Sequence, residues 1–338
     1  MKQHPFIEST FTKKDTVFEV GLRPQHLNEF VGQELICERL NVMIGAARKR
    51  NETLGHCLFF GPPGLGKTTL ATLLAKSMGT NLVSTSAPAI EKPGDLAGLL
   101  TTLEEGDVLF IDEIHRLNKA IEEYLYSAME DFSIDILIDS GANARSVKLK
   151  LKPFTLACAT TRQGMITAPL RSRFALTCRL DFYPIEALKK IILRTASLLN
   201  FDIDPQGLHE ISSRSRGTPR IANNLLRWVR DFSEMKSDGC GKDTVVKALE
   251  MLTIDHLGLD EMDRKILQVI IEHYNGGPVG LKTVGIALGE DENTLEEVYE
   301  PYLILLGFLK RTPRGREATT KAYQHMNIIK KGEPDYDC

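Results

Sequence analysis

The chain has 338 residues, a formal net charge of −3 and 42% hydrophobic residues. This length exceeds one ordinary domain and suits two or three. The slightly acidic balance excludes a protein that binds nucleic acid over its whole surface, so any contact with a polyanion has to come from local basic patches.

Membrane and redox signals are absent from the sequence. The N-terminal segment has no apolar core of the kind found in signal peptides, and the longest apolar run, residues 302–309, is too short to cross a bilayer. None of the six cysteines has the C-x-x-C spacing of a zinc or redox site. We therefore expect a cytoplasmic, reducing compartment and no membrane contact.

The first 20 residues are polar and unpatterned, which predicts a flexible arm. Over residues 21–183, short apolar runs alternate with helical patterns, and this alternation predicts an α/β fold with a parallel sheet covered on both faces. The runs expected as strands are 56–61, 81–87, 107–112 and 154–161, and the expected helices are 67–79 and 118–132. Two alternating runs around SGANAR predict a hairpin inserted at 133–154.

The remainder of the chain predicts two smaller domains. Apolar positions recur at helical spacing throughout residues 184–256, which indicates a small helical domain. Residues 257–326 contain three helical patterns and then strand, turn and strand, the order of a winged helix. Pro301 has to kink or end the third helix, residues 317–323 are expected as the second wing strand, and residues 327–338 as a disordered tail.

The octet GPPGLGKT, from Gly61 to Thr68, matches the phosphate-binding motif G-x-x-x-x-G-K-[ST] in full. It follows an apolar run and precedes a helical pattern, which is the context that the motif requires. Glycines let backbone amides curl around phosphate oxygens, and the following helix presents its positive end to the same anion. We expect Lys67 to reach the β- and γ-phosphates and Thr68 to ligate Mg²⁺.

Two further expected strands end in polar residues. VLFIDE places Asp112 and Glu113 at the carboxyl end of a buried strand, where open α/β sheets bind ligands. Asp112 can hold Mg²⁺ through its water shell, and Glu113 can polarise the attacking water. Either Thr160 or Thr161, at the end of LACATT, could contact the γ-phosphate or that water.

Arginines recur at two places beyond these strands. Arg171 and Arg173 in APLRSRF can stabilise charge on a transferring phosphoryl group, also across a subunit boundary. Arg220 lies in the first turn of an expected helix, where a cation opposes the helix dipole, so that an anionic partner such as a phosphate would explain it.

These motifs together resemble the RuvB family, the hexameric AAA+ motors of Holliday junction branch migration in bacteria. GPPGLGKTTLA, VLFIDEIHRL, PLRSRF, RGTPRIANNLLRWVRDF and FLKRTPRGREATT carry the resemblance, which covers about residues 22–323. It implies a large AAA+ domain, a helical lid and a winged-helix domain, with ATP and Mg²⁺ as ligands. It further implies a role in homologous recombination, recombinational repair and the SOS response to DNA damage.

The resemblance also implies site residues. Arg173 corresponds to the arginine finger that acts in the neighbouring subunit, and Lys67, Asp112, Glu113 and Thr161 complete the catalytic set, with Thr68 and Asp112 on Mg²⁺. The implied ATP contacts are Leu22, Arg23, Gly61, Gly64, Leu65, Gly66, Lys67, Thr68, Thr69, Glu130, Asp131, Phe132, Arg173, Tyr183 and Arg220.

The resemblance also implies binding partners. In the family the inserted hairpin docks on RuvA, and Val147 and Leu149 occupy the matching apolar positions; RuvC is an expected member of the complex. Arg311 and Arg316 match contacts to double-stranded DNA that are not sequence-specific, and their spacing can put them at the base and the tip of the wing. Glu292 stands where some members carry a DNA-facing arginine, so that contact is not implied here.

Two alternatives remain on the sequence alone. One is an ATP-dependent clamp loader or chaperone-like remodeller whose last domain mediates subunit contacts. The other is a winged-helix transcription regulator in which ATP is only a switch, although the third helix of that domain is rich in glutamate and poor in base-reading side chains.

Overall fold

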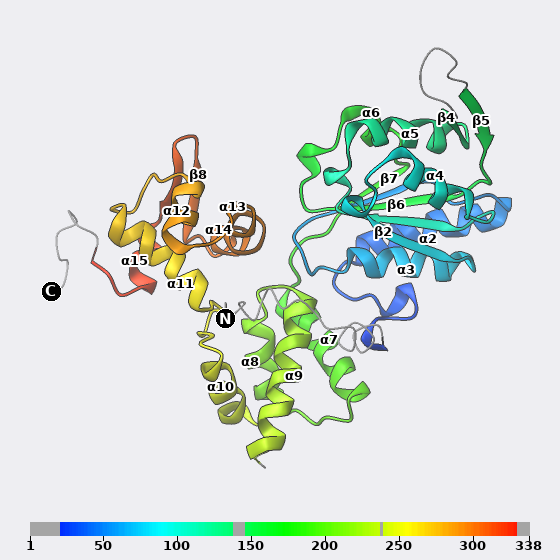
Figure 1. The fold of residues 1–338 in the computed structure, drawn as a ribbon. Coiled ribbons are helices and arrows are strands. Elements are labelled where there is room, and N and C mark those ends of the chain that lie inside the picture. Colours follow the sequence, from blue (N-terminus) through cyan, green and yellow to red (C-terminus); the bar gives the residue numbers. More distant parts are fainter. Residues whose placement is uncertain (1–20, 138–145, 237–238, 330–338) are drawn as a thin grey trace. The chain divides into compact units, whose positions relative to one another are not determined.

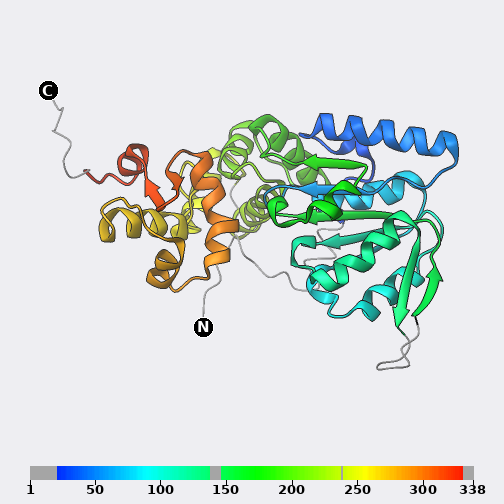
Figure 2. The ribbon, with the colours of Figure 1, turned by 90° about the horizontal axis from the view of Figure 1, so that it is seen from above.

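The computed structural model describes residues 21–137, 146–236 and 239–329, which fall into two compact units. The first unit ends at Tyr183 and the second begins at Pro184. Figures 1 and 2 show the chain in two views. The expected N-terminal arm, the SGANAR turn and most of the expected tail lie outside the described residues.

A parallel sheet in the order β2-β3-β6-β1-β7 forms the centre of the first unit. Its inner strands are nearly continuous apolar runs because both faces are covered, and β6 is buried along its whole length. Phe60 of β1 pairs with Thr160 of β6 and with Arg179 of β7. Because the strands are parallel, they all end at the same edge of the sheet, called the carboxyl edge here. They all begin at the opposite edge, the amino edge. The bounds are β1 Cys57–Phe60, β2 Leu82–Ser86, β3 Val108–Asp112, β6 Thr155–Thr160 and β7 Leu176–Arg179.

Helices cover both faces of this sheet, with α4 and α5 on one face and α2 and α3 on the other (Figures 1 and 2). Their ends follow capping chemistry: the side chain of Asn118 accepts from the first turn of α5, and α2 and α3 end at left-handed Asn51 and Gly79. The bounds are α2 Glu34–Arg50, α3 Lys67–Met78, α4 Pro93–Thr101, α5 Lys119–Glu130 and α6 Ala168–Ser172.

The segment expected as a hairpin contains two antiparallel strands, β4 Ser133–Leu137 and β5 Ser146–Lys150. Ile134 pairs with Leu149, and Ile136 pairs with Val147. Ile134 is buried in the core beneath α5, and Leu149 packs against the same core. The base of the hairpin is thus anchored to the sheet unit, while Val147 is farther out and exposed.

Four helices open the second unit. The first turn of α8 is capped by Asp204, whose side chain accepts from the backbone of Gly207, and Pro205 occupies the favoured starting position. Leu225, Leu226 and Val229 bury one face of α9. The bounds are α7 Ile185–Leu198, α8 Pro205–Arg214, α9 Pro219–Lys236 and α10 Lys242–Met251.

A winged helix follows, packed around Tyr299, Leu303 and Phe308. Its third helical segment joins α13, a π-helical stretch η7 and α14, and its wing is the pair β8 and β9. The bounds are α11 Glu261–Gln268, η6 Val269–His273, α12 Leu281–Leu288, α13 Glu292–Thr294, η7 Leu295–Tyr299, α14 Glu300–Leu305, β8 Leu309–Thr312, β9 Gly315–Ala318 and α15 Thr320–His325.

The structure tests several element predictions. The π-helical stretch ends at Tyr299 and Pro301 lies in the first turn of α14, where its missing N–H is tolerated, so a helical segment does end beside this proline as expected. The strand expected over 317–323 is wrong beyond Ala318, because the hydroxyl of Thr319 caps a short helix, α15. α2, α4 and the edge strand β7 were not expected at all.

Candidate functional site

The phosphate loop joins β1 to α3 at the carboxyl edge of the sheet. Gly61 and Gly66 have φ angles of 142° and 100°. A Cβ on Gly61 would lie 2.3 Å from the carbonyl oxygen of Leu180, and one on Gly66 would lie 2.9 Å from the ring of Phe30. The backbone therefore has the cradle shape that only glycine permits, which fits a bound polyphosphate.

Lys67 begins α3 and is buried beneath this loop. Its Nζ donates to the carbonyl oxygens of Gly61 at 2.8 Å and Pro62 at 2.9 Å. The ammonium group is thus held inside the concavity, where it can exchange these carbonyls for phosphate oxygens. Gly64, Leu65, Thr68 and Thr69 lie in the same loop and first turn, as the motif predicts.

A polar cluster lies beside the loop at the carboxyl ends of β3 and β6. Asp112 ends β3, and its Oδ1 accepts from the backbone N–H of Glu113, which is itself in the left-handed region with φ 51°. The hydroxyl of Thr161 donates to Glu113 Oε2 at 3.4 Å, and His115 Nδ1 lies 3.1 Å from the same oxygen. The carboxylate of Glu113 is therefore positioned from two sides.

The two threonines at the end of β6 differ in this cluster. Thr160 is fully buried, and its Oγ1 accepts from the backbone N–H of Arg162 and lies 3.0 Å from His115 Nδ1. Thr161 is the one that contacts Glu113. Of the two alternatives, Thr161 is therefore the one whose hydroxyl lies beside the carboxylate expected to polarise the attacking water.

Tyr183 closes the far side of the phosphate loop. Its hydroxyl donates to the carbonyl oxygen of Leu65 at 2.9 Å, and burial raises its pKa. The phenol therefore stays neutral and braces the loop backbone. Leu22 is buried and Arg23 is half-buried at the start of the described chain.

Arg173 lies at the opposite edge of the sheet. It follows α6 and precedes β7, whose first residue pairs with the start of β1. Its guanidinium donates to the carbonyl oxygen of Pro169, lies 3.0 Å from Glu130 Oε2 and stacks over the Tyr126 ring at 4.5 Å. Its buried Nε has no hydrogen-bond acceptor within the described part of the chain.

The end of α5 confirms that this is the amino edge. The carbonyl oxygen of Met129 lies 3.1 Å from Nε2 of His56, the residue before β1. Phe132 packs against the rings of His56 and Phe154 at 6.4 and 5.9 Å, and exposed Asp131 caps α5. The four residues of β1 separate this edge from the phosphate loop by roughly 13 Å.

Arg220 belongs to the second unit, as the second residue of α9. It occupies the first turn of that helix, as predicted.

The wing carries a cluster in which two arginines share one carboxylate. Arg311 and Arg316 are directly paired across β8 and β9, so the expected base-and-tip arrangement is wrong. Each donates from Nε to Glu300 Oε1 at 3.0 Å and from Nη2 to Glu300 Oε2 at 2.9 Å. Glu296 Oε1 lies within 3.4 and 3.8 Å of the same guanidinium groups.

These contacts keep Glu300 ionised and leave the two arginines exposed to different degrees. Burial would raise the pKa of Glu300, but the hydrogen bonds from Arg316 and Arg311 outweigh it and lower that pKa, so the carboxylate stays ionised. The side chain of Arg311 is 52% exposed and that of Arg316 is 17% exposed. Arg311 can therefore reach an outside anion, while Arg316 mainly orders the cluster. Lys310 and Arg314 add exposed positive charge beside the two-residue turn.

Several of these residues were not predicted as site residues from the sequence. His115 stands two residues after Glu113, and this proximity in the chain was the signal that could have identified it. Glu300 and Glu296 were read only as evidence of an acidic helix. Their i, i+4 spacing places them on one helix face, but the partner strands of that face could not be known from spacing alone.

The described residues contain neither a membrane-spanning helix nor a preformed metal cluster. No helix there is long and apolar enough to cross a membrane. No group of three or more His, Cys, Asp or Glu side chains there could hold a metal ion. The second finding is compatible with a magnesium ion that takes one hydroxyl and one carboxylate from the protein and its other ligands from phosphates and water.

Comparison with known proteins covers nearly the whole chain. Family models match residues 22–180 (Holliday junction DNA helicase RuvB P-loop domain), 183–255 (RuvB AAA lid domain) and 256–327 (RuvB C-terminal winged helix domain). These matches confirm the predicted fold class.

Individual relatives agree. The chain is 62% identical to a Holliday junction branch migration complex subunit RuvB of Protochlamydia amoebophila and 56% identical to that of Chlamydia pneumoniae; each alignment covers 95% of this chain and 97% of the relative. A solved structure of the Thermotoga maritima RuvB Holliday junction branch migration motor is 52% identical, with a TM-score of 0.84, over 91% of this chain and 99% of that one.

Proposed function

This chain belongs to the RuvB family, and we propose that it is the ATP-driven motor of Holliday junction branch migration. In this role it pulls duplex DNA through a ring of subunits during homologous recombination and recombinational repair. The observation that carries the proposal is the split site: the phosphate loop and Glu113 lie at one edge of the sheet, and Arg173 lies at the other.

ATP hydrolysis at the carboxyl edge uses the groups described above. Lys67 and the loop amides bind the β- and γ-phosphates, and Thr68 and Asp112 are the groups that would hold Mg²⁺. The ion would supply Lewis-acid stabilisation of phosphate charge. Glu113, positioned by Thr161 and His115, orients and polarises the attacking water.

The split site supports a ring. Because Arg173 cannot reach the phosphate loop of its own subunit across the sheet, it would serve a neighbour, as would Glu130, Asp131 and Phe132 beside it. A site that needs a neighbour on one edge and offers a finger on the other implies head-to-tail contacts, which form a ring when the rotation between subunits closes. We propose a homohexamer, with Arg220 as the γ-phosphate contact from the lid and Leu22, Arg23 and Tyr183 on the side of the base.

We also propose contacts with partner proteins. Exposed Val147, on the outer part of the hairpin, would meet the junction-binding protein RuvA, while half-buried Leu149 anchors the strand and contributes its exposed part. RuvC would join the complex at the junction. The five described cysteines are free thiols, which supports a reducing cytoplasm.

Duplex binding would fall to the wing, through phosphates. Arg311→Ala is expected to weaken duplex binding equally on unrelated sequences and to lower the slope of log K against log salt by about 1, as for one lost phosphate contact. Fluorescence anisotropy at several salt concentrations measures both quantities. Lys265→Ala, an exposed cation on α11, is the matched control and is expected to leave the slope unchanged. A loss that depended on sequence would favour a regulator instead.

Triplex displacement tests the motor activity. A third strand bound to a duplex is removed when a translocase passes, whatever the flanking sequence. We expect displacement that requires ATP and DNA ends or junctions onto which the ring can load, and that stops with a non-hydrolysable analogue. ATP hydrolysis stimulated by duplex DNA without any displacement would exclude a translocase and favour the clamp-loader or remodeller alternative.

A further inference from the structure

Two arginines lie four residues apart where the turn after α8 leads into α9. Arg220 is the proposed γ-phosphate contact of the lid, and Arg216 lies in the turn itself. The turn is internally braced, since the backbone N–H of Thr218 donates to Ser215 and that of Ala222 donates to Thr218. A displacement of Arg220 therefore displaces Arg216 with it.

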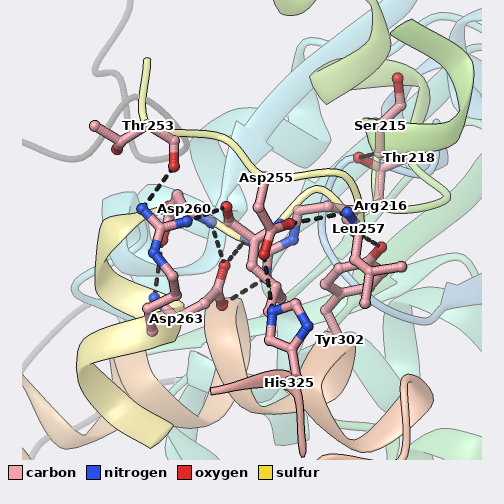
Figure 3. Close-up of polar contacts among 12 residues, drawn as sticks. Ser215, Arg216, Thr218, Thr253, Asp255, Leu257, Asp260, Asp263, Tyr302 and His325 are labelled. Atoms are coloured by element: carbon pink, nitrogen blue, oxygen red, sulfur yellow. Dashed lines mark hydrogen bonds and ion pairs between the residues drawn. The ribbon is translucent and has the colours of Figure 1, made fainter. Parts of the chain in front are cut away.

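Arg216 is joined to the first helix of the winged-helix domain (Figure 3). Its two Nη atoms donate to the two carboxylate oxygens of Asp263 at 2.8 and 3.1 Å, in a bidentate pair with side-chain exposures of 3% and 0%. The guanidinium also lies 4.6 Å from the ring centroid of Tyr302. Arg216 has a φ of 54°, an unfavourable angle for a residue other than glycine, so the turn holds a strained backbone in this position.

Asp263 is itself fixed in α11 by a reciprocal cap. Its Oδ2 accepts from the backbone N–H of Asp260 at 3.0 Å, and its own N–H donates to Asp260 Oδ1 at 2.9 Å. Burial raises the pKa of Asp263 to about 7, and Arg216 acts against that rise. The carboxylate is therefore an integral part of the helix start and depends on Arg216 for its charge.

The segment between the two domains is pinned at the same place (Figure 3). Tyr302 donates to the carbonyl oxygen of Leu257 at 2.6 Å, and Arg264 donates to that of Thr253 at 2.7 Å. His325 Nε2 lies 2.9 Å from Asp255 Oδ2. A Cβ on Gly258 would lie 2.5 Å from the carbonyl oxygen of Arg214, so this linker is packed onto the lid.

We propose that the Arg216–Asp263 pair is the joint through which the lid moves the winged-helix domain during the ATP cycle. Separating the pair would leave the buried guanidinium of Arg216 without its counter-ion, which is costly, whereas an ordinary flexible linker would absorb the displacement. Arg216 and Asp263 are thus positioning residues: they take no part in hydrolysis, but they convert movement of the Arg220 turn into movement of the wing. This inference rests on the motor function proposed above.

Asp263→Asn tests the joint, because it removes the charge while keeping the shape and a possible cap. We expect the kcat and KM of DNA-stimulated ATP hydrolysis to stay within about twofold, while triplex displacement per ATP hydrolysed falls by about 10-fold, in the range typical of coupling between sites. Glu261→Gln, which breaks the exposed Lys265–Glu261 pair on the same helix, is the matched control and is expected to change neither quantity. Arg216→Lys, which keeps the charge but loses the fork, should lie between native and Arg216→Gln.

A second measurement is made on the chain with the Arg216–Asp263 pair intact, so its main outcome does not require Asp263→Asn to fold. Spin labels at exposed Met235 on α9 and exposed Ile286 on α12, in a chain with Cys240 and Cys338 replaced by serine, report the distance between lid and winged helix. We expect one narrow distance that is the same with ADP and with an ATP analogue, and a broad distribution in Asp263→Asn. A broad or nucleotide-dependent distance in the unmutated joint overturns the inference, as does full displacement per ATP in Asp263→Asn. If the native chain displaces no triplex at all, the motor function itself fails.

Discussion

Arg173→Ala is expected to lower the kcat of DNA-stimulated ATP hydrolysis by about 10³-fold or more, the effect seen when an arginine finger is removed. The guanidinium lies at the amino edge of the sheet beside Glu130 and Tyr126, and we propose that it completes the site of the next subunit. ATP binding, measured with a fluorescent analogue, should change far less than kcat, because the loop and Lys67 are untouched.

Subunit mixing identifies the site that Arg173 serves. Lys67→Ala chains cannot hold nucleotide phosphates but still offer Arg173, and Arg173→Ala chains keep an intact loop. If the finger acts across the boundary, an equal mixture should recover a measurable part of the native rate, although each variant alone is inactive. Arg171→Ala serves as the control, because it removes an exposed neighbour whose guanidinium donates to the carbonyl oxygens of Gln163 and Ile166. Normal hydrolysis by Arg173→Ala, or no recovery in the mixture, would count against a finger supplied in trans.

Glu113→Gln is expected to keep ATP binding and to lower the rate of hydrolysis by about 10²- to 10⁴-fold, the usual contribution of a positioned base. The amide keeps the size of the side chain and its contacts with Thr161 and His115, but it cannot take up charge from the attacking water. Single-turnover hydrolysis of bound ATP measures the chemical step directly.

The control for this variant is Glu104→Gln, an exposed carboxylate of the same unit, which is expected to hydrolyse ATP at the native rate. A Glu113→Gln chain that turned ATP over normally would show that another group activates the water. Weak ATP binding by that chain would instead indicate that Glu113 supports the phosphate loop.

The geometry of the phosphate loop could be predicted from the sequence because its signals are local. GPPGLGKT requires backbone angles that only glycine adopts freely, and the structure has those angles at Gly61 and Gly66. The burial of β3 and β6 follows equally from short continuous apolar runs. The choice between Thr160 and Thr161 could not be made from sequence, since it depends on which hydroxyl faces Glu113 once β3 and β6 are paired.

Contacts between segments far apart in the chain could not be predicted from the sequence. The spacing of Arg311 and Arg316 suggested a wing base and tip, but a turn of only two residues pairs them directly and brings both to Glu300. Nothing in the pattern around Arg216 or Asp263 indicated that they meet, because they are far apart in the chain and each resembles an ordinary surface charge. The helix α15 was missed because threonine-rich EATTKAY favours a strand, whereas Thr319 acts as a cap.

The most direct test of the motor function is ATP-driven movement of a synthetic four-way junction whose arms share a mobile homologous core, in the presence of the junction-binding partner. Fluorescent labels on two arms report their separation into duplex products. The account predicts products that require ATP, the partner and an intact Glu113, and that form at similar rates for cores of unrelated sequence. A junction that stays in place with ATP and the partner present, while the chain hydrolyses ATP, would contradict it.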